Sequence, residues 1–303
     1  MRVVSLLPSA TEIVYALGVE PVATSHECDH PPAAAELPSA VESRIDADAS
    51  SAEIDEQVRR ADDDGGVYEI DRATLRAVDP DLVIAQGMCD VCAVDTVLVE
   101  AAIDDMGLEC ELLTTDPHHL GDVFEDIRRI GAALDREAAA AELLDDLDTR
   151  LARVIDRVPD GRERPSVAIL DWLDPVMVAG HWIPEAVECA GCRYDLADPG
   201  DVSRPRQWDE IRSADPDVLI AAPCGFEIEQ TVDDLDVLTD RPGFDDLAAV
   251  RENRVYAIDG HHLLNRPGPR LVDSIEVLAA VCFPDRFESP SSTFARQLLR
   301  QSA

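Results

Sequence analysis

Short apolar runs alternate with helical patterns along the chain. In the first part these runs predict buried strands at Val3–Leu7, Pro21–Thr24, Leu82–Ala85 and Cys110–Thr114. In the second part they predict strands at Val167–Leu170, Val176–Ala179, Val218–Ala221 and Val255–Ile258. Because strands that alternate with helices form βαβ units, the pattern predicts an α/β protein with mainly parallel sheets.

The first predicted helix follows directly on the first strand. Ser9 and Glu12 have the spacing of a capping box, so Ser9 is the expected N-cap. Apolar residues then recur every three or four positions, and Gly18 is expected to end the helix.

A weak internal repeat connects the two halves. Leu75–Ala85 resembles Ile211–Ala221, and in both segments a short helix is expected to end before an Asp-Pro-Asp turn that leads into a buried strand. The repeat therefore indicates two lobes of one architecture.

The longest helical pattern lies between the halves. Asp116 and Pro117 are a suitable start for it, Asp135 can cap a continuation, and Pro159–Gly161 ends it. A helix of about 20 residues is about 30 Å long, enough to act as a spine. We therefore expect two Rossmann-like lobes joined by a long helix: an N-terminal α/β lobe at 1–115, a connecting helical spine at 116–161 and a C-terminal α/β lobe at 162–303.

The charge of the chain is strongly unbalanced. It has 63 acidic and 26 basic residues, a formal net charge of -37, and every basic residue is arginine. So many negative charges repel one another in dilute buffer, and concentrated salt screens this repulsion. We therefore predict a salt-adapted protein. An acidic patch for a basic partner would instead gather the charge in one place. The sign of the charge argues against nucleic acid as a partner.

The start of the sequence reads as a strand. Near Met1 we find no apolar signal region, cleavage site or lipidation cysteine, and no run of about 18 apolar residues occurs later. Eight cysteines are too few for a disulfide scaffold. We therefore expect a cytoplasmic monomer without membrane insertion; a true start upstream would instead allow a cell-surface location.

Several segments resemble the cobalamin- and iron-chelate-binding proteins of ABC importers. The segment Val4–Gly18 resembles their opening. Ser25–Pro32 and Gln86–Val94 resemble a signal-peptide-free branch described as cobalamin-binding, and Ala179–Glu185 and Arg266–Asp273 extend the match into the second half. The resemblance implies two Rossmann-like lobes joined by a long helix, a corrinoid or similar small-molecule ligand in the cleft between them, and an ABC permease as partner.

Candidate ligand-binding residues follow from topology, because ligands of open α/β sheets bind beyond the carboxyl ends of the strands. In the N-terminal lobe this rule selects Pro8, Ser9, His26, Glu27, Cys28, Asp29, Gln86, Cys89, Asp90 and Cys92. In the C-terminal lobe it selects Trp172, His181, Trp182, Cys224, Phe226 and His261.

These residue types suit a corrinoid, which is a wide ring fringed by amides. Tryptophan offers flat contact area at a low cost in entropy, and histidine and aspartate can bond to the amides. A neutral imidazole can also coordinate cobalt, for which His26, His181 and His261 are candidates.

The Cys89 and Cys92 pair supports an alternative function. A CxxC pair can hold a soft metal or cycle as a dithiol, and Cys28 and His26 are expected nearby, so a soluble zinc-, iron- or redox-handling protein is possible. The pair can equally belong to a packed loop. A second CxxC, at Cys189 and Cys192, is interpreted as structural.

Motifs for catalysis are lacking in the sequence. It contains no nucleophile elbow, phosphate-binding loop, HExxH motif or dinucleotide-binding glycine motif. We therefore expect a binding protein rather than an enzyme, with an enzyme of corrinoid metabolism as the third hypothesis.

Overall fold

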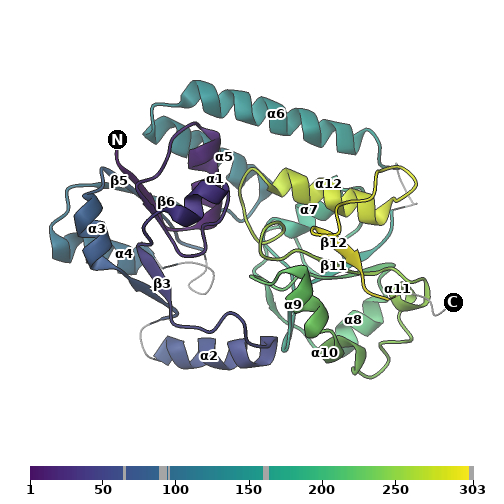
Figure 1. Cartoon of the computed structure of the whole chain (residues 1–303). Coiled ribbons are helices and arrows are strands. Elements are labelled where there is room, and N and C mark those ends of the chain that lie inside the picture. Colours follow the sequence, from purple (N-terminus) through teal and green to yellow (C-terminus); the bar gives the residue numbers. More distant parts are fainter. Residues whose placement is uncertain (64–65, 89–93, 95, 160–163, 300–303) are drawn as a thin grey trace. The chain divides into compact units, whose positions relative to one another are not determined.

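The computed structural model describes residues 1–63, 66–88, 94, 96–159 and 164–299 (Figure 1). The chain forms two compact units. Unit 1 comprises Met1–Asp46, Glu56–Pro117 and Gly121–Asp146, and unit 2 comprises Ala47–Asp55, His118–Leu120 and Leu147–Ala303. The domain ranges expected from the sequence stay a prediction.

The described part of unit 1 is built on a four-stranded sheet in the order β2-β1-β5-β6, in which all neighbours are parallel. Its strands are β1 (Val3–Ser5), β2 (Ala23–Thr24), β5 (Leu82–Gln86) and β6 (Glu111–Thr115). A separate antiparallel pair consists of β3 (Val41–Ser43) and β4 (Tyr68–Ile70).

The elements that complete unit 1 are mostly helical. They are α1 (Pro8–Ala16), the 3-10 helix η1 (Pro32–Glu36), α3 (Arg72–Val78), α4 (Thr96–Met106) and α5 (Leu120–Ala133), and α2 (Ser51–Asp63) lies partly in each unit. Leu75 of α3 and Val99 of α4 pack with Val4 and Val83 of the sheet in one core.

The first helix begins earlier than predicted. Its N-cap is Leu7, which makes no side-chain cap bond, and Ser9 lies inside the helix and is buried. Pro8 explains the shift, because proline has no N–H to satisfy and its backbone already suits the first helical turn. The predicted end is confirmed: Gly18 has φ +75 and its N–H donates to the oxygen of Tyr15 at 2.9 Å.

The described part of unit 2 contains a six-stranded mixed sheet in the order β12-β11-β10-β7-β8-β9. Its strands are β7 (Val167–Leu173), β8 (Val176–Val178), β9 (Arg204–Pro205), β10 (Val218–Ala221), β11 (Val255–Ile258) and β12 (Ala295–Gln297). The central strands β7, β10 and β11 are parallel, whereas β8, β9 and β12 run antiparallel to their neighbours.

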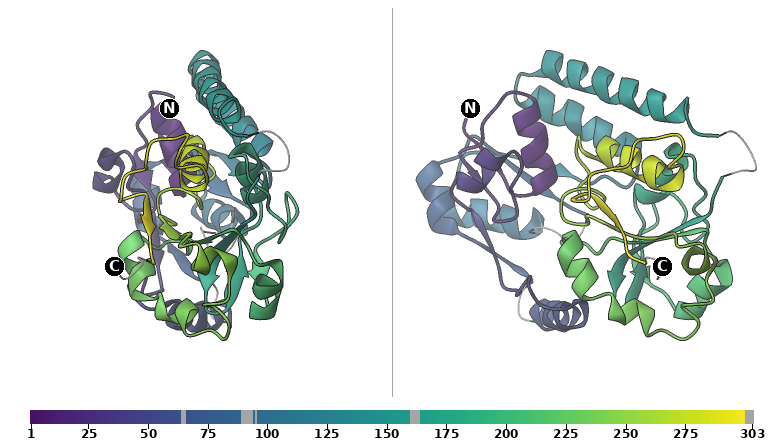
Figure 2. Two further views of the ribbon diagram at one scale, coloured as in Figure 1. Left: turned by 90° about the vertical axis from the view of Figure 1, so that its right-hand side faces the viewer. Right: turned by 45° about the vertical axis from the view of Figure 1, so that its right-hand side comes forward.

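Helices cover both faces of this sheet. They are α7 (Ile183–Cys189), α8 (Trp208–Ala214), α9 (Ile228–Asp233), α10 (Asp236–Thr239), α11 (Ala248–Arg251) and α12 (Leu271–Cys282). Helices α7 and α12 pack together on one side, and α8 and α10 lie on the other (Figures 1 and 2). On that second side Ile211 and Leu238 join Leu170 and Leu219 of the sheet in one core.

The internal repeat is confirmed in detail. Asp79 ends α3 with φ 46 and Asp215 ends α8 with φ 42, both in the left-handed region. Each donates its N–H to the carbonyl four residues before, Leu75 or Ile211, at 3.1 Å. In both units the next residues lead into a buried strand, β5 or β10.

The long helical pattern forms two helices. Asp135, with φ 55, separates α5 from α6 (Glu137–Ile155), and the boundary between the units falls inside α6. Asp116 and Pro117 do not start the first of these helices. At the start of α5 the backbone N–H of Leu120 donates instead to Glu185 Oε2 at 2.6 Å, and both residues belong to unit 2.

No helix in the described part of the chain is both long enough and apolar enough to cross a bilayer.

Candidate functional site

The parallel strands β7, β10 and β11 of unit 2 end at one edge of the sheet. Hydrogen bonds join the last part of β7 and the segments that follow β10 and β11: Cys224 N donates to Asp171 O at 3.0 Å, and Gly260 N donates to Phe226 O at 3.0 Å. The Asn265 amide donates to the carbonyls of Ala222, at 3.1 Å, and Gly260, at 2.9 Å. We call the surface formed by Asp171–Trp172, Cys224–Phe226 and Asp259–Arg266 the unit 2 edge.

An aromatic pair forms part of the unit 2 edge. The half-buried Trp172 ring meets the Phe226 ring edge to face, with the centroids 5.4 Å apart, and Phe226 is 1% exposed. A register shift between Leu170 and Trp172 interrupts the pairing of β7 with β8, and such bulges re-aim side chains. Phe226 is therefore a support inside the core, and Trp172 is the member that a ligand can reach.

A carboxylate and two histidines follow β11. The Oδ1 atom of Asp259 accepts the backbone N–H groups of His261, at 2.9 Å, and His262, at 2.7 Å. Its Oδ2 atom lies 2.8 Å from His262 Nδ1. Burial on its own raises the pKa of Asp259, but the hydrogen bonds from the side chain and backbone of His262 outweigh it and lower the pKa below its usual range. Hydrogen bonds therefore fix the position of the Asp259 side chain and favour its ionised form.

Arg266 fixes the other histidine. It is 5% exposed, and its Nη2 atom lies 3.0 Å from His261 Nε2. Because a guanidinium only donates, the Nε2 atom of His261 is the acceptor in this contact. Asp259, His262, Asn265 and Arg266 were not selected from the sequence. The sequence did contain one signal for them: an aspartate and a histidine three residues apart, Asp259 and His262, directly follow a buried strand.

The strand-end rule fails for His181 and Trp182. They follow β8, which runs antiparallel to β7, so the carboxyl end of β8 points away from the unit 2 edge. Trp182 is 4% exposed and its indole N–H donates to Leu264 O at 3.0 Å, which is a core position rather than the expected ligand contact. His181 has φ 54, and its Nδ1 atom lies 3.4 Å from His118 Nδ1.

In unit 1 the strand-end residues differ in how open they are. Ser9, Cys28 and Gln86 are buried, whereas Pro8, His26, Glu27 and Asp29 are at least partly exposed. The Cys28 Sγ atom is in contact with Thr11 Oγ1 at 3.1 Å.

His26 is held between two acceptors in unit 1. Its Nδ1 atom lies 3.0 Å from Val41 O and its Nε2 atom lies 3.1 Å from Glu27 Oε1. Burial lowers the pKa of His26, but the bond to Glu27, together with its charge and the Val41 carbonyl, raises the pKa above its usual value.

Cys89, Asp90 and Cys92 lie outside the described residues, so the predicted metal or redox site with Cys28 stays a prediction. The second CxxC agrees with its structural interpretation. Cys192 is 1% exposed in the loop that follows α7, and Cys282, at the end of α12, is within hydrogen-bonding reach of its thiol. These contacts together with burial raise the pKa of the Cys192 thiol far above its usual value.

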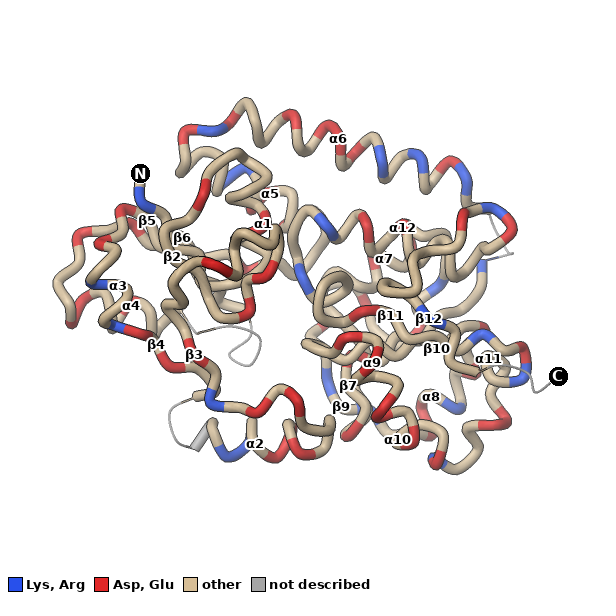
Figure 3. Tube along the Cα trace, in the orientation of Figure 1, with Lys and Arg blue, Asp and Glu red and all other residues tan. Residues whose placement is uncertain are grey.

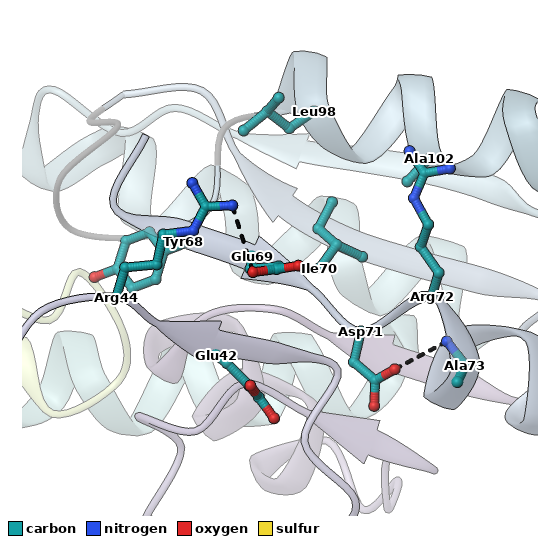
Figure 4. Close-up of a pocket in the computed structure, with 10 residues that line it drawn as sticks. All are labelled: Glu42, Arg44, Tyr68, Glu69, Ile70, Asp71, Arg72, Ala73, Leu98 and Ala102. Carbon is teal, nitrogen blue, oxygen red and sulfur yellow. Dashed lines mark hydrogen bonds and ion pairs between the residues drawn. The ribbon is translucent and has the colours of Figure 1, made fainter. Parts of the chain in front are cut away.

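A hollow of about 600 Å³ opens on the surface of unit 1, between the β3–β4 pair, the start of α3 and α4 (Figure 4). Both arginines that line it already have carboxylate partners: Arg44 lies 3.4 Å from Glu69, and Arg72 lies 3.1 Å from Asp105. Asp71 caps α3 by accepting the N–H of Ala73 at 2.9 Å. None of the residues selected from the sequence lines this hollow.

Two α/β units, each with parallel strands and with polar and aromatic residues near the carboxyl ends of these strands, have the architecture of the solute-binding proteins of ABC importers. The chain belongs to the periplasmic binding protein family, whose model matches residues 3–261. This family is non-catalytic: its members bind a small-molecule ligand and deliver it to an ABC permease.

The chain is similar to known proteins over most of its length. An uncharacterized ABC transporter substrate-binding lipoprotein, YvrC, of Bacillus subtilis (strain 168) is 24% identical over 295 residues, covering 95% of this chain and 81% of the relative. A periplasmic heme-binding protein from Pseudomonas aeruginosa superposes with a TM-score of 0.73 at 20% identity, covering 100% of this chain and 99% of that one.

The periplasmic vitamin B12-binding protein BtuF of Vibrio cholerae superposes with a TM-score of 0.61 at 20% identity, covering 93% of this chain and 96% of that one. At these identities the structures confirm the predicted two-lobed α/β fold and do not identify the ligand.

The predicted cytoplasmic location is wrong. The family is one of periplasmic binding proteins and the Bacillus subtilis relative is a lipoprotein, so both point to the cell surface. The prediction depended on the first residues of the sequence, and these are weaker evidence for the location than membership of an extracytoplasmic family.

Proposed function

We propose that this protein binds a corrinoid of the cobalamin type and that the unit 2 edge is part of its binding surface. The observation that carries the proposal is the Trp172 indole, backed by the buried Phe226 ring, at the same sheet edge as the hydrogen-bonded Asp259 and His262. A flat ring that contacts the indole gains apolar area without a large loss of side-chain entropy. The polar groups of the unit 2 edge can bond to side chains at the rim of that ring.

The charge of this edge favours a corrinoid over a heme. A heme carries two carboxylates that need cationic partners, whereas most corrin side chains are neutral amides. The basic residue described at this edge, Arg266, is buried and engaged with His261, and the carboxyl groups of Asp171 and Asp259 lie in the neighbouring segments. A second anionic ligand group would add repulsion in a chain of net charge -37.

Calorimetric titration in about 3 M KCl, a concentration at which charge is screened within a few Å, tests the proposal. Wild-type protein should bind cyanocobalamin saturably and bind hemin less tightly. Trp172→Ala should weaken cyanocobalamin binding at least about tenfold, because central aromatic contacts carry much of the affinity of a binding surface.

Trp208→Ala is the matched control. Trp208 is in the same unit, but it stacks on Phe244 and bonds to Pro242 O, and neither residue belongs to the unit 2 edge. Its loss should leave the affinity unchanged within about twofold. The proposal is wrong if cyanocobalamin produces no heat at about 100 μM, or if both tryptophan variants bind alike.

A further inference from the structure

We infer that the side-chain oxygen of Asn265 is a specificity determinant of the unit 2 edge. It accepts an N–H from one carboxamide at the rim of the corrin ring, and it thereby selects against ligands that carry a carboxylate at that position. The inference rests on the proposed function and makes it more specific. It narrows the ligand from corrinoids in general to those in which this one carboxamide is intact.

The first argument is the orientation of the Asn265 amide. Its Nδ2 atom donates to the carbonyl oxygens of Ala222, at 3.1 Å, and Gly260, at 2.9 Å. Because both partners are carbonyl oxygens, which only accept, the nitrogen of the amide and not its oxygen must face them. The two bonds use both hydrogens of this nitrogen. The Oδ1 atom is therefore directed away from the two carbonyls and is left for another partner.

The second argument is the rigidity of the segment that carries Asn265. Its neighbours Leu264 and Arg266 are buried, at 1% and 5% exposure, and the Leu264 carbonyl accepts the indole N–H of Trp182 at 3.0 Å. The backbone N–H of Arg266 donates to Leu263 O at 3.1 Å. The side chain of Asn265 is thus held in place before a ligand arrives, so a bond to it costs little conformational entropy.

The third argument is the availability of the Asn265 oxygen. Asn265 is half-buried, and within the described part of the chain no group bonds to its Oδ1 atom. Nor is Oδ1 among the described buried polar atoms that lack a hydrogen bond. An oxygen that is neither bonded nor buried is open to solvent, and a ligand N–H can take the place of the solvent.

The chemistry of this oxygen determines what it selects. A carboxamide donates N–H groups to it, whereas an ionised carboxylate at the same place offers only acceptor atoms and a negative charge. A site that is built for a hydrogen bond rejects an analogue that cannot make it, because polar groups are then left unpaired. The net charge of -37 also disfavours an anionic ligand, but it acts on all rim positions alike. A short-range acceptor acts on one position.

Calorimetric titration with cyanocobalamin and its monocarboxylic acids, in each of which a different carboxamide is hydrolysed, tests the inference. At about pH 7.5 the carboxyl group of each acid is ionised, and about 3 M KCl screens the long-range charge within a few Å. Wild-type protein should bind one acid at least about tenfold more weakly than cyanocobalamin, because that acid loses a hydrogen bond and leaves Oδ1 unpaired. The other acids should bind within about threefold of cyanocobalamin.

Asn265→Ala removes the acceptor. In this variant the disfavoured acid should bind within about threefold of cyanocobalamin. The substitution also removes the bonds to Ala222 and Gly260, and this loss weakens the binding of all ligands together. The readout is therefore the ratio of affinities between acid and amide, from which a common loss cancels.

Trp172→Ala is the matched control for this ratio. The proposed contact of Trp172 is with the face of the ring, which cyanocobalamin and its acids share. The control should weaken the binding of all of them and keep the wild-type ratio of at least about ten. A ratio that falls as far in Trp172→Ala as in Asn265→Ala would overturn the role of Asn265.

Failure of the inference and failure of the proposed function give different results. If cyanocobalamin binds and the acids share one affinity, or the penalty on one acid persists in Asn265→Ala, the inference is overturned and corrinoid binding stands. If cyanocobalamin does not bind, both are overturned. Should Asn265→Ala fail to fold in a thermal unfolding control, the wild-type series decides: a penalty confined to one position supports the inference, and an even penalty overturns it.

Discussion

The Trp172 ring meets the Phe226 ring edge to face, with the planes at 63°. Phe226 is buried, so this contact links the packing of the core to the orientation of Trp172, a side chain of the proposed binding surface. Phe226→Leu keeps most of the apolar volume and should lower the free energy of unfolding by only about 1–2 kcal/mol. It removes the aromatic edge that orients Trp172, and corrinoid affinity should fall by about three- to tenfold.

Phe244→Leu provides the comparison for this prediction. Phe244 is also buried in unit 2 and lies beneath a tryptophan, Trp208, with the ring planes at 20°. Thermal unfolding should show similar losses of stability for the two variants, whereas calorimetric titration should show weaker binding only for Phe226→Leu. Equal affinities in the two variants would contradict a role for Phe226 in orienting Trp172.

Gly260 permits a close backbone approach at the unit 2 edge. A Cβ atom at this position would lie 2.0 Å from Pro223 O and 2.8 Å from Ala222 O, so the segments after β10 and β11 would have to separate. Gly260→Ala should therefore lower the free energy of unfolding by about 2 kcal/mol or more and weaken ligand binding. Denaturant unfolding and titration measure the two effects.

Gly121→Ala is the opposite case and the control for Gly260. A Cβ atom at Gly121, in α5, meets nothing within 4 Å among the described residues. Alanine should stabilise this helix by about 0.5–1 kcal/mol. A neutral outcome for Gly260→Ala would mean that the loops can move apart freely.

The sequence was sufficient to predict features that depend on local chemistry. The apolar runs located β10 and β11 at Val218–Ala221 and Val255–Ile258, and Gly18 ended α1, because burial and left-handed backbone leave marks in short stretches of sequence. The Asp79 and Asp215 repeat belongs to the same category, since each aspartate ends a helix in the left-handed region.

Features that depend on tertiary structure could not be predicted. Trp182 was expected at a ligand surface on the assumption that β8 runs parallel to its neighbours. The strand in fact turns back on β7 as a hairpin, and hydrophobic periodicity does not reveal the direction of a strand. The contact of Arg266 with His261 is a second example, because the side chain of Arg266 reaches His261 only after the chain folds back from β11. The fold could therefore be predicted from the sequence more fully than the candidate site could.

Asp171 should give the protein a distinctive pH dependence. Burial raises the pKa of Asp171 to about 6, although the Ser203 hydroxyl lowers it, and no described residue bonds to its buried Oδ1 atom. Because the folded-state pKa lies above the ordinary value of 3.8, the folded state favours the protonated form. The resulting stabilisation is complete below about pH 3.8 and is lost as the pH rises through about 6. The difference corresponds to up to about 3 kcal/mol.

Asp171→Asn should remove this dependence. The variant should match wild type near pH 4 and exceed it by about 2 kcal/mol at pH 7.5 in the free energy of unfolding. Comparison with wild type also cancels the contribution of Asp126, whose pKa burial likewise raises to about 6. Asp174→Asn, at an exposed turn of the same hairpin, should change stability by less than about 0.5 kcal/mol at both pH values. Parallel pH profiles for Asp171→Asn and wild type would contradict the prediction.

Arg150 connects two helices within unit 2. Its guanidinium bonds to Asp273, and to Glu276 through Nη2 at 2.7 Å and Nε at 3.1 Å, so one planar group serves two carboxylates of α12. Arg150→Met leaves these carboxylates facing each other and should lower the free energy of unfolding by about 1–3 kcal/mol. Arg150→Lys should recover only part of this loss, because an ammonium lacks the fork geometry. Arg153→Met, at an exposed position of the same helix, should be nearly neutral in denaturant unfolding.

The excess of acidic residues predicts that salt stabilises the folded state. Acidic residues occur along the elements of both units (Figure 3). With 63 acidic and 26 basic residues, ion pairs such as the exposed Arg72–Asp105 can neutralise only a minority of the acidic groups. The Debye length falls from about 10 Å at 0.1 M to about 3 Å at 1 M, so repulsion should decrease faster than the short ion-pair contacts weaken. The thermal midpoint should therefore rise by about 10 °C or more between 0.2 M and 3 M KCl.

A charge variant separates screening from other effects of salt. Asp145, Asp146 and Asp148 are exposed on α6, and replacing all three by asparagine reduces the net charge from -37 to -34. The variant should be more stable than wild type at 0.2 M KCl and nearly equal to it at 3 M, because screening removes the repulsion that the substitutions relieve. A gain that stays constant across the KCl series would indicate helix propensity instead, and a midpoint that falls with KCl would refute salt adaptation.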